Sequence, residues 1–298
     1  MVYELTAKTP VIWLPTSVEE AVDLKNQFSS EGEFVSGATL LQLQWMNGRK
    51  MPNHLISLEQ ILALKVVKLE NNFLSIGALT TLGTYQKHPL FKEYPILCDA
   101  LKSIAAPAVR NRGTIGGNVM AGVGDLIPFL LAMEAKLVIH ESDGSKKVDF
   151  WDWLQTKPRA ANVLLEKIEI PYDINEPNSV SFYRKIGRRE TFTAAILTVS
   201  GKLKWDENGV INAVKLAVGG GDNKPSRLQK TEQLLIGKIG EEIDWKALYR
   251  SINEEFIPAV DAFVSGDYRK KVAANLIVAE LQSKLTIRSQ REEHVYEI

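Results

Sequence analysis

Cysteine is almost absent from this sequence, since its 298 residues contain only one, Cys98. A single thiol cannot form an internal disulfide or a CxxC redox pair, and it cannot supply the several thiolates that hold an iron–sulfur cluster. Cys98 stands beside Leu97, which is more typical of a core cysteine than of a nucleophile. Disulfide chemistry and cluster chemistry carried by this chain alone are therefore excluded.

An excess of charge and long apolar runs are also missing. The 36 Lys and Arg residues balance the 36 Asp and Glu residues, so no basic surplus favours nucleic acid or an anionic membrane. No apolar run approaches the roughly 20 residues of a membrane helix. Residues 1–6 lack the basic flank and apolar stretch of an export signal. The sequence predicts a cytoplasmic globular protein.

The usual catalytic motifs are missing too. The four histidines, His54, His88, His140 and His294, are scattered without HExxH or HxxxH spacing. The sequence has no GxSxG nucleophile elbow. We therefore nominate no catalytic side chain and expect no metal site.

The length suggests about two domains, and the polar, proline-bracketed residues 171–178 are the best boundary. Before that boundary, a helix beginning near Ser17 is expected to end at Gly32. Short strands at 33–36 and 54–58 come next, and we expect them to be parallel. The predicted domains are residues 1–172, with two subdomains split near 58, and residues 178–298.

Two hairpins are expected in the first domain, pairing 64–69 with 73–76 and 136–141 with 146–150. The second domain shows strand patterns at 180–187, 193–205 and 210–218, followed by helical patterns. Gly219, Gly220 and Gly221 end the last of these strands, and a plain turn is expected after them. Strands followed by helices predict an α+β fold.

The strongest chemical signal is the segment 110–118, RNRGTIGGN. Its adjacent glycines allow a ligand to approach the backbone closely, and successive N–H groups could hold phosphate oxygens, with hydrogen bonds from Thr114 and Asn118. A plain glycine-rich turn between buried elements is an equal alternative. The segment is neither a Walker loop nor the GxGxxG of a Rossmann turn.

Three weaker signals accompany this segment. Residues 36–39, SGAT, follow a strand and suit an anion, although alone they are better explained as a turn. Asp125 is either a helix cap or an acceptor for a sugar or ribityl hydroxyl. Arg184 and Arg188 belong either to a solvated edge or, by alternation, to one face near an anionic ligand. Two small-residue loops in one domain favour a ligand with a pyrophosphate.

Together these segments resemble the FAD-binding (medium) subunit of the molybdenum hydroxylases, of the xanthine dehydrogenase and carbon monoxide dehydrogenase flavoprotein type. Residues 109–118 match the family motif IRNxGTIGGN, and residues 17–21, 75–78, 125–128, 131–135 and 217–227 support the match. The resemblance covers nearly the whole chain. It implies a two-subdomain FAD-binding domain followed by a small antiparallel sheet with helices.

The resemblance also implies a cofactor site. FAD would lie between the two subdomains of the N-terminal half, with its pyrophosphate held by the two small-residue loops. Asp125, Leu165 and Arg184 match positions that line FAD in relatives, and Ile104 stands where some members place an aromatic residue. The candidate FAD-binding residues are Val35, Ser36, Gly37, Ala38, Thr39, Leu40, Leu41, Ile104, Thr114, Ile115, Gly116, Gly117, Asn118, Asp125, Leu165 and Arg184.

The implied function is electron transfer within an oxidoreductase complex. A molybdopterin-containing large subunit would oxidise the substrate, and an iron–sulfur small subunit would pass electrons to FAD, which reduces NAD+ or another acceptor. A hetero-oligomer, such as a dimer of heterotrimers, is implied. The single cysteine fits this division of labour. The substrate class is set on the molybdenum subunit, so purines, aldehydes, N-heterocycles and carbon monoxide stay open.

Two other functions stay open from the sequence. One is a self-contained FAD-dependent oxidoreductase of the same fold, and the other is an adaptor without flavin. Two departures from the family pattern keep the adaptor open: Ala38 replaces a glycine, and the loop 119–124 before Asp125 is about two residues short. A third departure, Arg184 in place of a lysine, keeps the charge but not the shape of the side chain.

Overall fold

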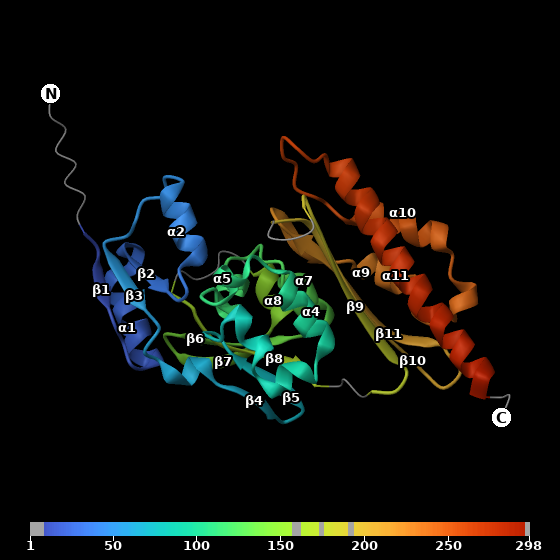
Figure 1. Ribbon diagram of the computed structural model, residues 1–298, viewed down its shortest axis with the longest axis horizontal. Coiled ribbons are helices and arrows are strands. Elements are labelled where there is room, and N and C mark those ends of the chain that lie inside the picture. The colour runs from blue at the N-terminus through green and yellow to red at the C-terminus, as the bar shows by residue number, and fades with distance from the viewer. Residues whose placement is uncertain (1–8, 157–161, 173–175, 190–193, 296–298) are drawn as a thin grey trace. The chain divides into compact units, whose positions relative to one another are not determined.

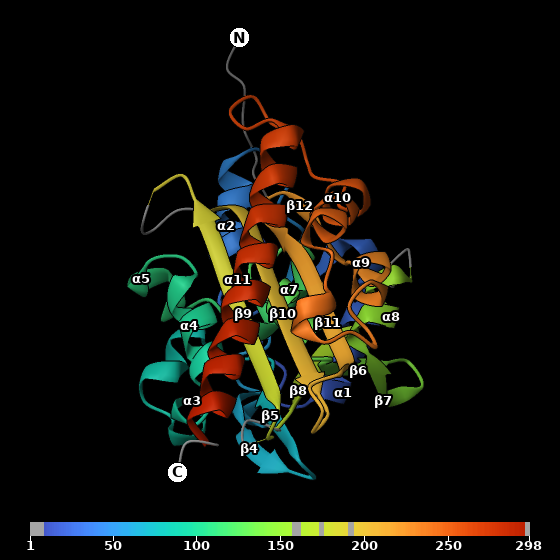
Figure 2. The same cartoon turned by 90° about the vertical axis from the view of Figure 1, so that its right-hand side faces the viewer.

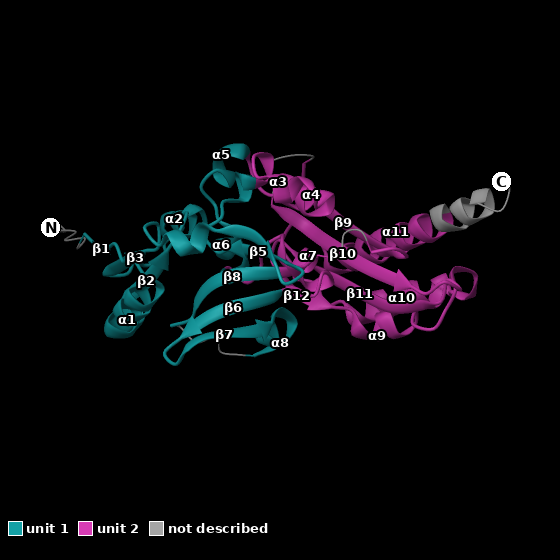
Figure 3. Ribbon diagram, turned by 90° about the horizontal axis from the view of Figure 1, so that it is seen from below, with its two compact units in different colours: residues 1–84, 107–120, 136–169 teal, residues 85–106, 121–135, 170–298 magenta. Residues whose placement is uncertain are grey.

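The computed structural model describes residues 9–156, 162–172, 176–189 and 194–295, and side chains as far as Thr286. The chain divides into two compact units, each assembled from separate segments (Figure 3). Unit 1 comprises residues 1–84, 107–120 and 136–169, and unit 2 comprises residues 85–106, 121–135 and 170–298. The opening residues 1–6, and residues 173–175 of the expected domain boundary, lie outside the described residues.

Unit 1 begins with a three-stranded parallel sheet (Figure 1). Its order is β1 (Val11–Trp13), β3 (His54–Ser57), β2 (Gly32–Val35). Helix α1 (Val18–Phe28) packs on it through a core that includes Val22 and Ile56. The expected parallel pairing of the two short strands is confirmed.

The end of α1 differs from the expectation. The helix stops at Phe28, where Ser29 takes a positive φ of 47°, and Lys25 donates hydrogen bonds to the carbonyls of Ser29 and Gly32. Burial lowers the pKa of Lys25. Gly32 does not end the helix but begins β2. A Cβ at this position would lie 2.9 Å from the Cβ of Phe28, so the close approach of the strand to the end of α1 requires a glycine.

The second sheet of unit 1 has five strands in the order β4, β5, β8, β6, β7. Their bounds are β4 Val67–Glu70, β5 Phe73–Gly77, β6 Lys136–Glu141, β7 Gly144–Asp149 and β8 Leu164–Pro171. Both expected hairpins are confirmed. The first turns through Asn71 and Asn72, whose φ angles of 50° and 60° are those an asparagine pair tolerates in a tight turn. The short elements of this part of the chain are α2 (Thr39–Met46), η2 (Leu62–Lys65), η3 (Leu82–Gln86), α5 (Pro107–Arg110), α6 (Ile115–Met120) and α8 (Phe150–Gln155).

Unit 2 is built on an antiparallel sheet in the order β12, β11, β10, β9. Its strands are β9 (Ser179–Gly187), β10 (Ala195–Trp205), β11 (Ile211–Gly220) and β12 (Asn223–Arg227). The long helix α11 (Gly266–Val295) crosses β9 and β10 (Figure 2), while α7 (Ile127–Ala132) contacts β10 and β11. The other helices are α3 (Pro89–Lys92), α4 (Pro95–Ser103), α9 (Gln229–Gln233), η4 (Gly240–Glu242) and α10 (Trp245–Glu255).

Strand β12 corrects the expectation of a plain turn after Gly221. Gly220 and Gly221 take positive φ angles of 80° and 61°, which reverse the chain so that Asn223–Arg227 pairs with β11. The expected α+β class, with an antiparallel sheet and helices in the C-terminal part, is confirmed. Within the described ranges, no helix is both long and apolar enough to cross a membrane.

Candidate cofactor site

The two small-residue loops predicted from the sequence lie side by side in unit 1. Residues 36–39 connect β2 to α2, and a Cβ built on Gly37 would stand 1.8 Å from the carbonyl oxygen of Arg112. Any side chain at Gly37 would therefore push the loops apart. A hydrogen bond of 3.1 Å between the hydroxyls of Ser36 and Thr114 joins them.

The N-terminus of α2 offers free backbone donors. Ala38 is the N-cap residue, in a left-handed conformation (φ 57°, ψ 2°), and no side chain caps the helix. Among the described residues, no acceptor engages the N–H groups of Gly37, Ala38 or Thr39. Uncapped N–H groups at the positive end of a helix dipole attract anions, above all phosphate.

The loop after Thr114 contributes differently from what the sequence suggested. The N–H groups of Ile115 and Gly116 donate to the carbonyls of Thr80 and Ala78, both at 2.9 Å. Those of Gly117 and Asn118 donate to the hydroxyl and carbonyl oxygens of Thr114. The interpretation that successive N–H groups of this loop hold phosphate is therefore wrong, because these donors anchor α6 instead.

The loop after Thr114 contributes space for a ligand rather than hydrogen-bond donors. Gly117 is exposed, and a Cβ there would lie 2.9 Å from the hydroxyl oxygen of Thr114 and 3.4 Å from that of Ser36. The missing side chain keeps the surface beside this hydroxyl pair open. Free N–H groups, two hydroxyls and an unobstructed approach together suit a diphosphate.

The other candidates of unit 1 lie on three elements, β8, β2 and α2. Leu165 is buried in β8, where it pairs with Ile139 of β6, so its side chain belongs to the interior of unit 1. Val35 ends β2, and its carbonyl accepts from the N–H of Leu58 at 2.9 Å. Leu40 and Leu41 lie in the first turn of α2, with Leu40 42% exposed.

In unit 2, Asp125 belongs to a mostly buried polar cluster. Its carboxylate pairs with Lys185 Nζ at 2.8 Å and accepts from the N–H of Gly221 at 3.2 Å. Lys185 also donates to the carbonyl of Ser103 at 2.9 Å. The hydroxyls of Tyr183 and Ser103 share a hydrogen bond of 3.1 Å. Burial, and then the charge of Asp125, raise the pKa of the Tyr183 phenol, which stays protonated.

Arg184 lies on the other side of the same sheet. Its Nε donates to Glu280 of α11 at 2.7 Å, and Arg188 faces Asp261 in the segment before α11 at 3.7 Å. Arg184 and Arg188 thus share a face, as alternation predicts. The structure does not bring Arg184 to Asp125, and the cation beside Asp125 is Lys185, which the sequence interpretation missed. Ile104, also in unit 2, is buried at the C-terminal end of α4.

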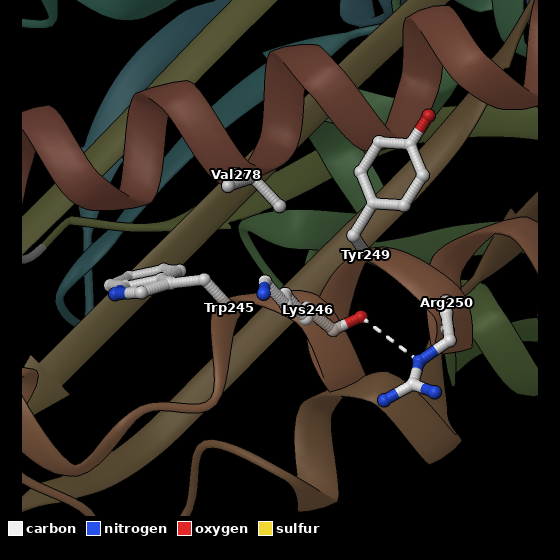
Figure 4. A pocket seen from close by; sticks show the side chains of 5 residues that line it. All are labelled: Trp245, Lys246, Tyr249, Arg250 and Val278. Carbon is white, nitrogen blue, oxygen red and sulfur yellow. Dashed lines mark hydrogen bonds between the residues drawn. The ribbon is translucent and has the colours of Figure 1, made fainter.

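A shallow pocket lies apart from these candidates, between α10 and α11 of unit 2. It has a volume of about 500 Å³ and is lined by Trp245, Lys246, Tyr249, Arg250 and Val278 (Figure 4). Arg250 Nε donates to the carbonyl of Lys246 within its own helix. No candidate FAD residue lines it, so this pocket carries no part of the cofactor assignment.

Two family models account for most of the chain. The FAD binding domain in molybdopterin dehydrogenase matches residues 6–173, and the CO dehydrogenase flavoprotein C-terminal domain matches residues 181–283. The chain belongs to the FAD-binding medium subunits of the molybdopterin dehydrogenases. It is thus the FAD subunit of an oxidoreductase complex, and medium chains of this family imply large and small partner subunits.

Curated relatives agree with this family. The chain is 26% identical over 231 residues to the nicotinate dehydrogenase FAD-subunit of Eubacterium barkeri, covering 75% of this chain and 78% of the relative. It is 27% identical over 282 residues to the carbon monoxide dehydrogenase medium chain of Hydrogenophaga pseudoflava, covering 90% and 94%. A solved carbon monoxide dehydrogenase from Hydrogenophaga pseudoflava matches with a TM-score of 0.83 at 25% identity, covering 91% of this chain and 95% of that chain.

Proposed function

We propose that this medium subunit carries electrons from the iron–sulfur clusters of a small partner subunit, through FAD, to NAD+ or another acceptor. The observation that carries the proposal is the uncapped N-terminus of α2 beside the Ser36–Thr114 hydroxyl pair, which is suited to the FAD diphosphate. When bound, FAD supplies the redox chemistry, and the protein supplies binding and orientation. The net charge of the chain is zero, so local donors rather than a bulk field must hold the diphosphate.

We assign roles by unit. In unit 1 the N–H groups of Gly37, Ala38 and Thr39 and the two hydroxyls would hold the diphosphate, while Gly117 leaves room for it. In unit 2 the Lys185–Asp125 pair fixes the polar cluster around Tyr183, and Asp125 and Ile104 remain candidate contacts for the rest of FAD. Arg184 can contact FAD directly only after its hydrogen bond to Glu280 is broken. None of these side chains has to act as an acid or base.

The partners belong to the proposal as well. We infer a molybdopterin-containing large subunit and an iron–sulfur small subunit, assembled as a dimer of heterotrimers in the cytoplasm. The relatives are subunits or chains of dehydrogenases acting on nicotinate, glyceraldehyde or carbon monoxide, which supports a common electron-carrying role with the substrate chosen elsewhere. We also propose a domain boundary within residues 171–178 and a division of the first domain near residue 58.

Anaerobic reduction of the native complex tests the relay. On addition of the complex's substrate, we expect the flavin absorbance to bleach only when the molybdopterin and iron–sulfur subunits are present, and to recover on addition of NAD+ or an artificial acceptor. The isolated chain with substrate is the control and should stay oxidised. Substrate oxidation by the isolated, FAD-loaded chain would show a self-contained oxidoreductase and contradict the relay.

A further inference from the structure

The pocket between α10 and α11 of unit 2 has the size and the lining of a small-molecule site. Its volume of about 500 Å³ falls within the range of about 300–1,000 Å³ that is usual for ligand pockets. The residues that line it are Trp245, Lys246, Tyr249 and Arg250 of α10 and Val278 of α11. Two aromatic rings and two cations therefore border the same cavity.

The apolar side of the pocket is held in place by the core of unit 2. Trp245 and Tyr249 are one helical turn apart on α10, and both pack with Val278 against the buried cluster of this unit. The two rings lie on either side of Val278 in Figure 4. Because this packing orders the rings before a ligand arrives, binding costs the protein little conformational entropy. Aromatic rings favour offset or edge-to-face contact with another ring, so this surface suits a flat aromatic ligand.

The polar side of the pocket is positively charged. Lys246 and Arg250 are also one turn apart, and like charges at this spacing repel each other. Within the described part of the chain, no carboxylate forms an ion pair with either side chain. Asp244, the N-cap of α10, instead accepts from the backbone N–H groups of Lys246 and Ala247 at 3.0 and 2.9 Å. The two cations are thus available to an anion that enters the pocket.

The guanidinium of Arg250 is oriented by its own helix. Its Nε donates to the carbonyl of Lys246 at 3.4 Å, as the dashed line in Figure 4 marks. This bond uses one of the five N–H donors and leaves the two terminal nitrogens for a ligand. A guanidinium binds a carboxylate or a phosphate through two parallel hydrogen bonds, which gives the anion a defined orientation.

We propose that this pocket binds a small aromatic anion, a flat ring that carries a carboxylate or a phosphate group. The ring packs against Trp245 and Tyr249, and the anionic group pairs with Lys246 and Arg250. A neutral ligand would leave both cations without a partner, and an aliphatic anion would leave both rings without one. No candidate FAD residue lines the pocket, so the site is separate from the cofactor and does not depend on the proposed function.

The test titrates the full-length chain with three probes and follows the broadening of their proton NMR signals. Naphthoate represents the aromatic carboxylates, adenosine monophosphate represents the aromatic phosphates, and naphthamide is the uncharged counterpart of naphthoate. We expect an anion to bind and naphthamide to bind about fivefold more weakly than naphthoate, or worse. The anion that binds more tightly identifies which of the two anionic groups the pocket takes.

Variants locate the bound probe. Trp245→Leu keeps an apolar side chain on the core but removes the ring, so both naphthalene probes should bind about fivefold more weakly or worse. Lys246→Gln with Arg250→Gln should weaken naphthoate binding by a similar factor and leave naphthamide binding unchanged. Lys92→Gln is the matched control, because Lys92 is an exposed lysine of α3 that does not line the pocket.

Four results would overturn the proposal. Absence of anion binding at millimolar concentration removes the site, and equal affinity for naphthoate and naphthamide removes the recognition of charge. Wild-type affinity in both pocket variants places the probes elsewhere on the chain. Binding to the isolated chain that is lost in the complex assembled with partner subunits makes the pocket part of a subunit interface.

Discussion

Gly117→Val is expected to give a folded protein that binds FAD much more weakly. The valine Cβ would lie 2.9 Å from the Thr114 hydroxyl, and its methyl groups would fill the space beside the Ser36–Thr114 pair. Gly117 is exposed, and the atoms that a valine Cβ would approach are two side-chain hydroxyl oxygens and no backbone atom, so the valine displaces side chains and not the main chain. The affinity for FAD, measured by titrating the flavin-free protein with FAD, should fall about tenfold or more, because a clash costing over about 1.4 kcal/mol raises the dissociation constant by that factor.

Ala38→Gly is the matched control for this variant. Ala38 holds a left-handed conformation that costs a non-glycine residue roughly 1–2 kcal/mol, and glycine removes that cost while keeping the free N–H groups. The Ala38→Gly protein should therefore bind FAD at least as tightly as wild type. Wild-type affinity for FAD in Gly117→Val, by contrast, would show that the diphosphate is not bound beside the hydroxyl pair.

The largest loss of stability is expected from Lys185→Met. The side chains of Lys185 and Asp125 are only 8% and 13% exposed, and removing the cation leaves a largely buried carboxylate without its counter-charge. Breaking a buried pair from one side costs about 3–5 kcal/mol. Urea unfolding followed by tryptophan fluorescence measures the loss in the free energy of unfolding.

The double variant Asp125→Leu with Lys185→Met distinguishes the electrostatic contribution to the free energy of unfolding from the packing contribution. Replacing both members of a buried pair by apolar residues is often close to neutral, so this protein should recover most of the lost stability. A loss below about 1 kcal/mol in Lys185→Met alone would mean that the pair is solvated and that Lys185 does not fix the cluster around Tyr183.

Much of the fold could be predicted because its signals are local. The Asn71–Asn72 turn and the strand patterns specify their own hairpins, and α1 begins where the sequence predicted, with the Ser17 hydroxyl as its cap. Strand β12 was missed because three consecutive glycines are typical of a strand end followed by a turn. In the structure, Gly220 and Gly221 reverse the chain so that a further strand pairs with β11.

The candidate site could be predicted only in part. The two small-residue segments, 36–39 and 110–118, identified the loops that meet, because close backbone contact requires residues such as Gly37. Which loop has free N–H groups depends on tertiary hydrogen bonds, such as that from Ile115 to Thr80, which no local pattern reveals. Lys185 was missed because neighbouring residues of a strand point to opposite faces of the sheet, and the sequence does not say which face of β9 lies toward Asp125.

The visible spectrum of the purified wild-type chain tests the central claim most directly. We expect the two absorption bands of oxidised flavin, and denaturation should release non-covalent FAD in a ratio near one per chain. A colourless protein that stays colourless after incubation with FAD would contradict the assignment of the α2 N-terminus and the Ser36–Thr114 pair to the FAD diphosphate.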